Sequence, residues 1–198
     1  MNTKGLIFVI SAPSGAGKTT ICRDLSRSRR DLKYSISCTT RPKRPGEKHA
    51  TDYYFLSEKE FKTTVSRGGF AEWAMVHGYH YGTPRNALDR ELNGGRDVIM
   101  DIDVQGGLKI KKTYPGAVLV FVMTPTFNEL KKRLEARKKD SREVIEKRLH
   151  NARKELESLP RYEYLVINDR LEKAEKDVEA IIEAEHMKVR RGLAARFK

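Results

Sequence analysis

The chain contains 198 residues, a length that suits one domain with a sizeable buried core. No apolar run approaches the roughly 18 residues that span a bilayer, and no small-residue cleavage site precedes the first apolar run, so we expect neither a transmembrane helix nor a signal peptide. A total of 40 Lys and Arg against 27 Asp and Glu gives a net charge of +13, which favours anionic partners, either phosphorylated small molecules or nucleic acid. Two cysteines, Cys22 and Cys38, do not suggest a disulfide framework, and we expect a cytoplasmic protein.

An apolar run, a glycine-rich loop and a helix-compatible stretch follow one another near the start, at Leu6–Ile10, residues 12–20 and Ile21–Arg27. This order is the context that a phosphate-binding loop requires. Glycines let successive backbone N–H groups turn toward phosphate oxygens, Lys18 can reach the β- and γ-phosphates, and the Thr19 hydroxyl can bind Mg²⁺. We therefore predict an ATP-binding loop formed by Ala12, Pro13, Ser14, Gly15, Ala16, Gly17, Lys18, Thr19 and Thr20.

Residues 34–83 break the alternation of strands and helices. Arg41 and Arg44 lie in a segment that Pro42 and Pro45 stiffen, and paired guanidinium donors suit a phosphate monoester. The hydroxyls of Tyr53 and Tyr81 could donate to the same phosphate. A helix is predicted to begin at Ser57, with Ser57 and Glu60 forming a capping box. We interpret the segment as an inserted arm that binds the acceptor substrate.

Further strand-like runs occur at Val98–Ile102, Val118–Met123 and Tyr164–Ile167, with helical patterns between them. Together with the first run they predict a parallel sheet covered by helices on both faces. Asp101 and Asp103 follow the second of these runs, as the carboxylates of a Walker B strand do, and Asp101 could hold Mg²⁺ directly or through water.

Two helices are predicted to start at capping boxes, one at Thr126 with Glu129 and one with Asp140 as the cap and Glu143 as its partner. The second helix has a core-facing apolar stripe, and a last helix is predicted at Leu171–Met187. Arginines on this predicted helical hairpin could close over a triphosphate and stabilise the transferring phosphoryl group: Arg133, Arg137 and Arg148.

Seven motifs occur in the order A-P-S-G-A-G-K-T, S-I-S-C-T-T-R-P-K-R-P-G-E, D-Y-Y-F, F-A-E-W-A, Y-G-T-P, D-I-D-V-Q-G and V-I-N-D. In this order they resemble the guanylate kinase family, from about Gly5 to Ala184. The departures are Ala12, where part of the family has glycine, Thr83, where some members have serine, and the absence of the expected glycine after Arg137.

The resemblance implies transfer of the γ-phosphoryl group of ATP to GMP, and to dGMP, with Mg²⁺. It implies a single α/β domain of the P-loop NTPase type: a three-layer core with a parallel sheet at about residues 1–33, 84–125 and 160–198, a GMP-binding arm at about 34–83 and a helical lid at about 126–159. We use the names arm and lid for these segments below.

The resemblance also implies the site residues. For GMP they are Ser37, Arg41, Arg44, Tyr53, Glu72, Tyr81, Thr83 and Asp103. The catalytic set is Lys18, Arg44, Arg137 and Arg148, with Arg133 contributing from the lid. Asn168 is implied near the adenine of ATP, and Thr19 and Asp101 near Mg²⁺.

Three other functions remain open: a non-catalytic guanylate kinase-like module that binds phosphopeptides, a kinase of the same superfamily that acts on a ribose phosphate, and a nucleic-acid binder. The intact Lys18 and Thr19 argue against the first, and Glu72 with Ser37 against the second. Only the net charge suggests the third, and because the excess is spread over the whole chain, charge alone does not decide between a nucleotide enzyme and a nucleic-acid binder; we do not expect a nucleic-acid partner. We expect no membrane partner, and a homo-oligomer is left open.

Overall fold

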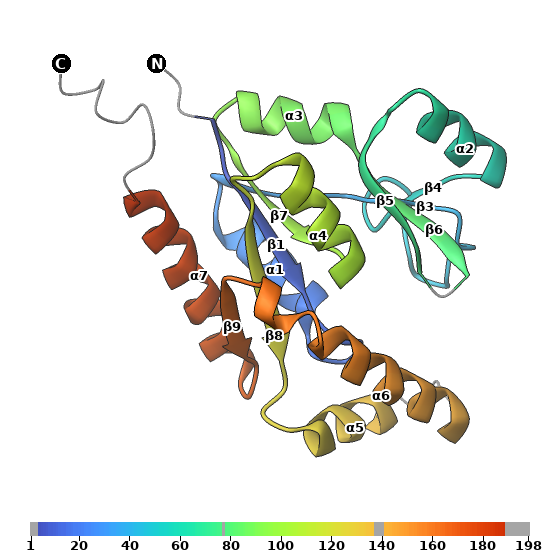
Figure 1. Cartoon of the computed structure of the whole chain (residues 1–198), viewed down its shortest axis with the longest axis vertical. Coiled ribbons are helices and arrows are strands. Elements are labelled where there is room, and N and C mark those ends of the chain that lie inside the picture. The colour runs from blue at the N-terminus through green and yellow to red at the C-terminus, as the bar shows by residue number, and fades with distance from the viewer. Residues whose placement is uncertain (1–3, 77, 137–140, 189–198) are drawn as a thin grey trace.

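A five-stranded parallel sheet forms the centre of the computed structural model, which describes residues 4–76, 78–136 and 141–188 (Figure 1). The strand order is β2-β7-β1-β8-β9. The bounds are Ile7–Ser11 for β1, Leu32–Tyr34 for β2, Asp97–Asp101 for β7, Val118–Met123 for β8 and Tyr164–Ile167 for β9. All four pairings are parallel, so the predicted α/β fold with a parallel sheet is confirmed, and β2 is an additional edge strand.

Helices cover both faces of this sheet. Helices α1 (Lys18–Ser28) and α7 (Leu171–Met187) pack on one face, and α3 (Arg85–Asn93) and α4 (Val104–Thr113) pack on the other. Along β1, Phe8 packs toward α1 and α7, whereas Val9 packs toward α3 and α4. Because the strand is buried on both sides, its sequence is a continuous apolar run.

The arm forms a second, smaller sheet beside the core (Figure 1). Its strand order is β4-β3-β6-β5, with a parallel β3–β4 pair and antiparallel β3–β6 and β5–β6 pairs. Helix α2 (Glu58–Ser66) has the predicted capping box of Ser57 and Glu60. The bounds of the strands are Cys38–Thr39 for β3, Tyr54–Phe55 for β4, Phe70–Val76 for β5 and Tyr79–Pro84 for β6.

The lid consists of α5 (Phe127–Ala136) and α6 (Arg142–Leu156), followed by a 3₁₀ turn at Leu159–Arg161. The hydroxyl of Thr126 accepts from the Glu129 backbone N–H at 3.1 Å, as its predicted cap requires. The prediction of Asp140 as the second cap is wrong by one residue, because Ser141 is the N-cap and its hydroxyl accepts from the Val144 N–H.

Core burial agrees with the predicted helix patterns. The predicted stripe on α6 is buried at Ile145, Leu149 and Ala152, and α7 has the predicted bounds. Cys22 and Cys38 are both buried free thiols. Within the part of the chain that the structure describes, no helix is long and apolar enough to cross a membrane.

The approach of Gly5 to the start of β7 generates a stability prediction. A Cβ at Gly5 would lie 1.9 Å from the Arg96 carbonyl oxygen, so Gly5→Ala must displace backbone at the amino ends of the interior strands β1 and β7. We expect a loss of about 1–3 kcal/mol in the free energy of unfolding, measured by urea titration. Gly116→Ala is the control, because no atom lies within 4 Å of its Cβ position. Equal stability of the two variants would contradict the prediction.

Candidate active site

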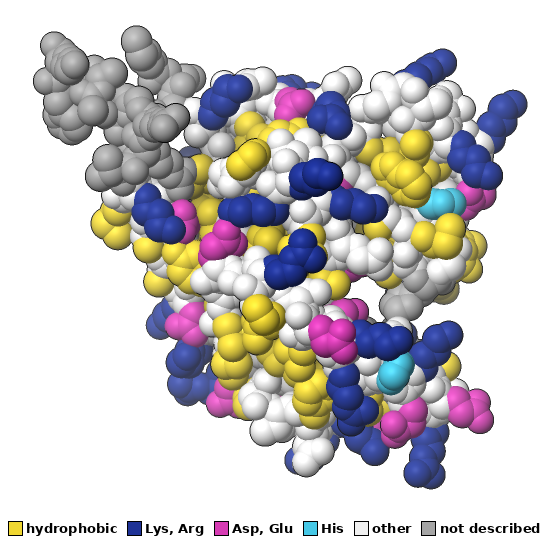
Figure 2. Space-filling view, in the orientation of Figure 1, with side chains coloured by type: hydrophobic (Ala, Val, Ile, Leu, Met, Phe, Trp, Pro, Cys, Tyr) yellow, Lys and Arg dark blue, Asp and Glu magenta, His cyan; other side chains and the backbone are white. Residues whose placement is uncertain are grey.

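A cavity of about 320 Å³ lies at the carboxyl ends of the central strands, where the core, the arm and the lid meet. Figure 2 shows the surface indented between the arm and the lid, with Lys and Arg side chains dispersed over the visible face. Ligands in open parallel sheets bind at this edge. The cavity is lined by Ala12, Pro13, Ser14, Gly15, Gly17, Lys18, Thr19, Thr20, Ser37, Arg44, Tyr53, Glu72, Ala74, Val76, Tyr81, Asp101, Ile102, Asp103 and Glu155.

The glycine loop connects β1 to α1, and its backbone conformation requires glycine at two positions. Gly15 and Gly17 have φ angles of 99° and 94°, in the region that other residues rarely adopt. Gly17 is the N-cap of α1, so the first N–H groups of the helix face the loop. The loop therefore presents backbone donors and the positive end of a helix dipole to an anion.

Asn168 supports this loop from below. The side chain follows β9, is buried, and donates through Nδ2 to the Ala16 carbonyl oxygen at 2.7 Å. A Cβ at Gly17 would lie 2.3 Å from the same Nδ2, so the amide occupies the space that the glycine leaves. Asn168, predicted beside the adenine, thus holds the loop backbone and does not line the cavity.

Lys18 begins α1 and is paired with Asp101 at the end of β7. Burial by itself lowers the pKa of Lys18, but the adjacent Asp101 carboxylate outweighs burial and the pKa is raised. The lysine is therefore charged at neutral pH.

Glu72 is a buried carboxylate of the cavity, with 7 % of its surface exposed. It lies opposite Thr83 in the β5–β6 ladder and accepts a hydrogen bond of 2.7 Å from the Thr83 hydroxyl. Burial raises the pKa of Glu72 to about 7, against the lowering effect of this hydrogen bond. Because the Thr83 hydroxyl donates to Glu72, Thr83 orients the carboxylate from beneath the cavity.

Asp103 and Ser37 line the same cavity as Glu72. The Asp103 carboxylate caps α4 and accepts from the Gly106 N–H at 2.9 Å, which leaves its other oxygen available. A Cβ at Gly106 would lie 3.0 Å from Glu72 Oε2, so the glycine allows α4 and the arm to approach closely.

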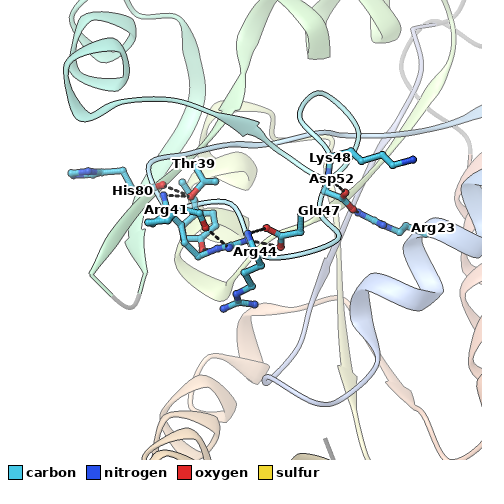
Figure 3. Close-up of polar contacts among 10 residues, drawn as sticks. Arg23, Thr39, Arg41, Arg44, Glu47, Lys48, Asp52 and His80 are labelled. Atoms are coloured by element: carbon cyan, nitrogen blue, oxygen red, sulfur yellow. Dashed lines mark hydrogen bonds and ion pairs between the residues drawn. The ribbon is translucent and has the colours of Figure 1, made fainter. Parts of the chain in front are cut away.

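The two arm arginines are organised by Glu47 (Figure 3). The Arg41 guanidinium donates to Glu47 Oε1 at 2.7 Å, and the Arg44 N–H donates to Oε2 at 2.8 Å. Arg41 is buried and also donates to the Tyr81 hydroxyl at 3.3 Å. Figure 3 shows the Arg44 guanidinium extending away from Glu47. Arg44 lines the main cavity and an adjoining cavity of about 290 Å³, which Arg41, Tyr53 and Tyr81 also line.

The predicted lid arginines occupy different positions. Arg148 on α6 donates to the Ser14 hydroxyl in the glycine loop at 2.9 Å. Arg133 on α5 donates to the Glu129 carboxylate at 3.0 Å and to the Asp169 carbonyl oxygen at 3.1 Å. Arg137 lies outside the described residues.

Glu155 is a cavity residue that the sequence analysis missed. It lies on α6 and is half-buried, and burial together with the nearby Asp103 raises its pKa to about 7. Its spacing of seven residues from Arg148 puts both on one helix face, which is the signal that could have identified it. Glu47 was missed in the same way: it lies in the motif that contains Arg41 and Arg44, but it was assigned no role.

A glycine loop between a central parallel strand and a helix, with a lysine beside a strand-end aspartate, defines the P-loop class of nucleotide-binding proteins. Comparison with known proteins gives the particular family. A family model described as guanylate kinase matches residues 4–185. The chain belongs to the guanylate kinase family, and it is an enzyme of the kind that phosphorylates GMP from ATP.

Individual relatives agree with this assignment. The guanylate kinase of Syntrophotalea carbinolica is 48% identical over 153 residues, which cover 77% of this chain and 73% of the relative. That of Thermotoga maritima is 45% identical over 150 residues, covering 76% and 72%. The crystal structure of guanylate kinase from Anaplasma phagocytophilum superimposes with a TM-score of 0.82 at 31% identity, covering 98% of this chain and 93% of that one.

The position of Asn168 generates a prediction for the donor nucleotide. Asn168→Asp replaces the amide donor with an acceptor facing the Ala16 carbonyl, and a lost buried hydrogen bond costs roughly 1–3 kcal/mol. We expect the KM for ATP to rise at least tenfold in steady-state assays, and the KM for GMP to stay within about twofold. Inhibition by inorganic tripolyphosphate, which has no base, should weaken in parallel.

Asp169→Asn is the control, because it changes the neighbouring exposed side chain. If Asn168→Asp impaired ATP but left tripolyphosphate inhibition intact, its role would lie at the base and not at the loop.

Proposed function

We propose that the chain transfers the γ-phosphoryl group of ATP to GMP or dGMP in the cavity described above, giving ADP and the nucleoside diphosphate. The observation that carries this proposal is the presence of Glu72 and Lys18 in the lining of one cavity. The first is a buried carboxylate suited to a guanine, and the second belongs to a loop suited to a triphosphate. The groups assigned below to acceptor recognition engage base and phosphate, so a missing 2′-hydroxyl is tolerated.

Glu72 recognises the guanine. Guanine presents the N1–H and the exocyclic N2 donors on one edge, and a carboxylate accepts from both. Thr83 fixes the carboxylate, Ser37 donates to O6, and Asp103 contributes a second acceptor at the same end of the cavity. Adenine lacks this donor pair and would leave the buried carboxylate without donors on the side of the base, a mismatch that discriminates by about 10⁴-fold in comparable sites.

The acceptor phosphate is bound by the arm arginines and tyrosines. Arg41 and Arg44 supply permanent charge, and Glu47 holds the backbone of one and the side chain of the other. The hydroxyls of Tyr53 and Tyr81 complete the set, since both line the same two cavities. No general base is required, because a phosphate monoester with a second pKa near 6 is mostly dianionic at neutral pH.

Catalysis consists of aligning the two nucleotides and neutralising charge on the transferring group. Residues 12–20 hold the triphosphate, Asn168 holds the loop beneath it, and Lys18 moves from Asp101 to the phosphate oxygens. Arg44 reaches the transferring group from the arm, and Arg148 reaches it from the lid with Arg133 and Arg137. Closure of the lid excludes water and suppresses ATP hydrolysis.

The donor set suits Mg²⁺. The Thr19 hydroxyl and the Asp101 carboxylate both line the cavity, and Mg²⁺ binds one or two protein oxygens together with waters and substrate phosphates. Among the described residues no group of three His, Cys, Asp or Glu side chains is placed to hold a metal ion, so phosphate oxygens supply the other ligands. When bound, Mg²⁺ neutralises charge on the β- and γ-phosphates.

We propose a cytoplasmic location, where both nucleotides are available.

The direct test is formation of ADP from ATP and Mg²⁺ with a panel of acceptors: GMP, dGMP, AMP, UMP and ribose bisphosphate. ADP that depends on GMP and dGMP supports the proposal. ADP that depends on ribose bisphosphate would indicate the related phosphoryl transferase. Binding of phosphopeptide without acceptor-dependent ADP would indicate the non-catalytic module.

Removing either central charge should abolish turnover. Lys18→Met deletes the cation that bridges the phosphates, and Arg44→Ala deletes the arm charge on the transferring group. We expect kcat to fall by roughly 10³-fold or more in each case, because charge neutralisation supplies several kcal/mol of the barrier reduction. Lys111→Met, which removes a lysine paired with Glu163 away from the cavity lining, is the matched control. Near-normal turnover in either active-site variant would overturn these roles.

The raised pKa of Glu72 predicts a pH dependence of acceptor binding. Guanine requires the ionised carboxylate, and with a pKa of about 7 that form is lost as the pH falls below 7. Between pH 8 and pH 6 we expect the KM for GMP to rise about tenfold from this group, and about twofold more from protonation of the GMP phosphate. Glu72→Gln should have a high KM for GMP that retains only the smaller pH dependence. An unchanged pH profile in this variant would remove Glu72 from base recognition.

A further inference from the structure

The arm is joined to the core on two sides by different interactions. On one side β5 packs against α4, with Gly106 close to Glu72 and the Lys109 ammonium donating to the Trp73 carbonyl oxygen. On the other side the loop of residues 48–53 reaches helix α1. The first side is a packed interface. The second depends on polar contacts.

The second contact is an ion pair between Arg23 and Asp52 (Figure 3). Arg23 Nη2 lies 2.6 Å from Asp52 Oδ1, and the two side chains are 30% and 17% exposed. The Arg23 guanidinium also lies 5.6 Å from the centre of the Tyr34 ring, at the end of β2. Among the ion pairs between described residues, the pair of Arg23 and Asp52 is the one that joins the core to the arm. Partial burial makes it stronger than an exposed surface pair.

Asp52 connects this ion pair to the acceptor site. Its second oxygen accepts from the Lys48 N–H at 2.6 Å, which closes the loop. The hydrogen bonds from Lys48 and Arg23 hold the pKa of Asp52 below its usual range, so the carboxylate is charged at neutral pH. Tyr53 follows directly, and its ring lies 5.9 Å from that of Tyr81 and 5.5 Å from the Arg41 guanidinium.

Arg23 connects the same ion pair to the donor site. It lies one helical turn after Thr19 on α1, and both line the cavity of about 290 Å³ that contains the arm arginines. A displacement of the arm away from α1 would separate Arg23 from Asp52 and move Tyr53 away from Thr19. The ion pair therefore sets the spacing between the two phosphate-binding sets.

We infer that Arg23 is a positioning residue for the acceptor phosphate, which acts through Asp52 to hold the arm loop and Tyr53 against the start of α1. This inference rests on the proposed function, because the acceptor is taken to be a nucleoside monophosphate. In this role Arg23 does not contact the phosphate, because its guanidinium is paired with Asp52.

The test is a double-mutant cycle on the full chain, with Arg23→Ala, Asp52→Asn and the double variant. Asp52→Asn removes the charge but keeps an oxygen that can accept from the Lys48 N–H. We expect each single variant to raise the KM for GMP about tenfold, with kcat within about threefold and the KM for ATP within about twofold. The double variant should also show a rise of about tenfold, because both changes break one interaction.

A second ion pair on α1 supplies the control. Arg27 and Asp24 are 3.2 Å apart and 74% and 39% exposed, so Arg27→Ala and Asp24→Asn should leave all constants unchanged. Arg23→Lys, which keeps the charge and shortens the reach, should give an intermediate KM for GMP. Melting temperatures identify any variant that fails to fold, and the remaining variants then decide the result.

Three results would overturn the inference while wild-type activity remains. A KM for GMP that rises in Arg23→Ala but not in Asp52→Asn would mean that Arg23 binds the phosphate itself. A KM for GMP that rises about a hundredfold in the double variant, the product of the two single effects, would mean that the residues act independently. Constants equal to those of the Arg27→Ala control would mean that the pair has no role. A wild-type chain without GMP-dependent ADP formation would instead overturn the proposed function, and the inference with it.

Discussion

Two phosphorylated nucleotides can react only if their mutual repulsion is neutralised at one point, and the fold places its cations accordingly. Parallel strands end at a common edge, so Lys18 after β1 and Asp101 at the end of β7 meet there. The arm adds Arg44, and α6 adds Arg148 against the loop. Lys18 is paired with the Asp101 carboxylate, whereas the Arg44 guanidinium extends away from Glu47 and Arg148 donates to the uncharged Ser14 hydroxyl, so positive charge is directed at the point where the phosphates meet.

The central strands β1, β7 and β8 were predictable because they are almost entirely buried. Runs such as Val118–Met123 have no polar residue, and that signal does not depend on the rest of the fold. β2 escaped prediction because three residues with a lysine at the centre carry no periodic signal, and the two-residue strands β3 and β4 are shorter still. The boundary error at Asp140 reflects two adjacent residues that both suit a helix cap.

The residues of the candidate site were predictable where they form contiguous motifs in the sequence. They were not predictable where their roles depend on contacts between segments far apart in the sequence. The loop residues and the arginine block are contiguous motifs. The support of Ala16 by Asn168 joins positions 152 residues apart, and the pairing of Arg23 with Asp52 depends on how the arm folds back on α1. Thr83 differs in that the resemblance implied it as a GMP-site residue, whereas its hydroxyl donates to Glu72.

The hydrogen bond between Asn168 and Ala16 couples the glycine loop to an edge strand of the sheet. The loop follows the central strand β1, whereas Asn168 follows β9, the edge strand that pairs with β8. If β9 separates from β8, the Ala16 carbonyl loses its partner and the loop loses this support. Opening of this sheet edge therefore opposes retention of a triphosphate, and by the same linkage a bound triphosphate stabilises the pairing of β9 with β8.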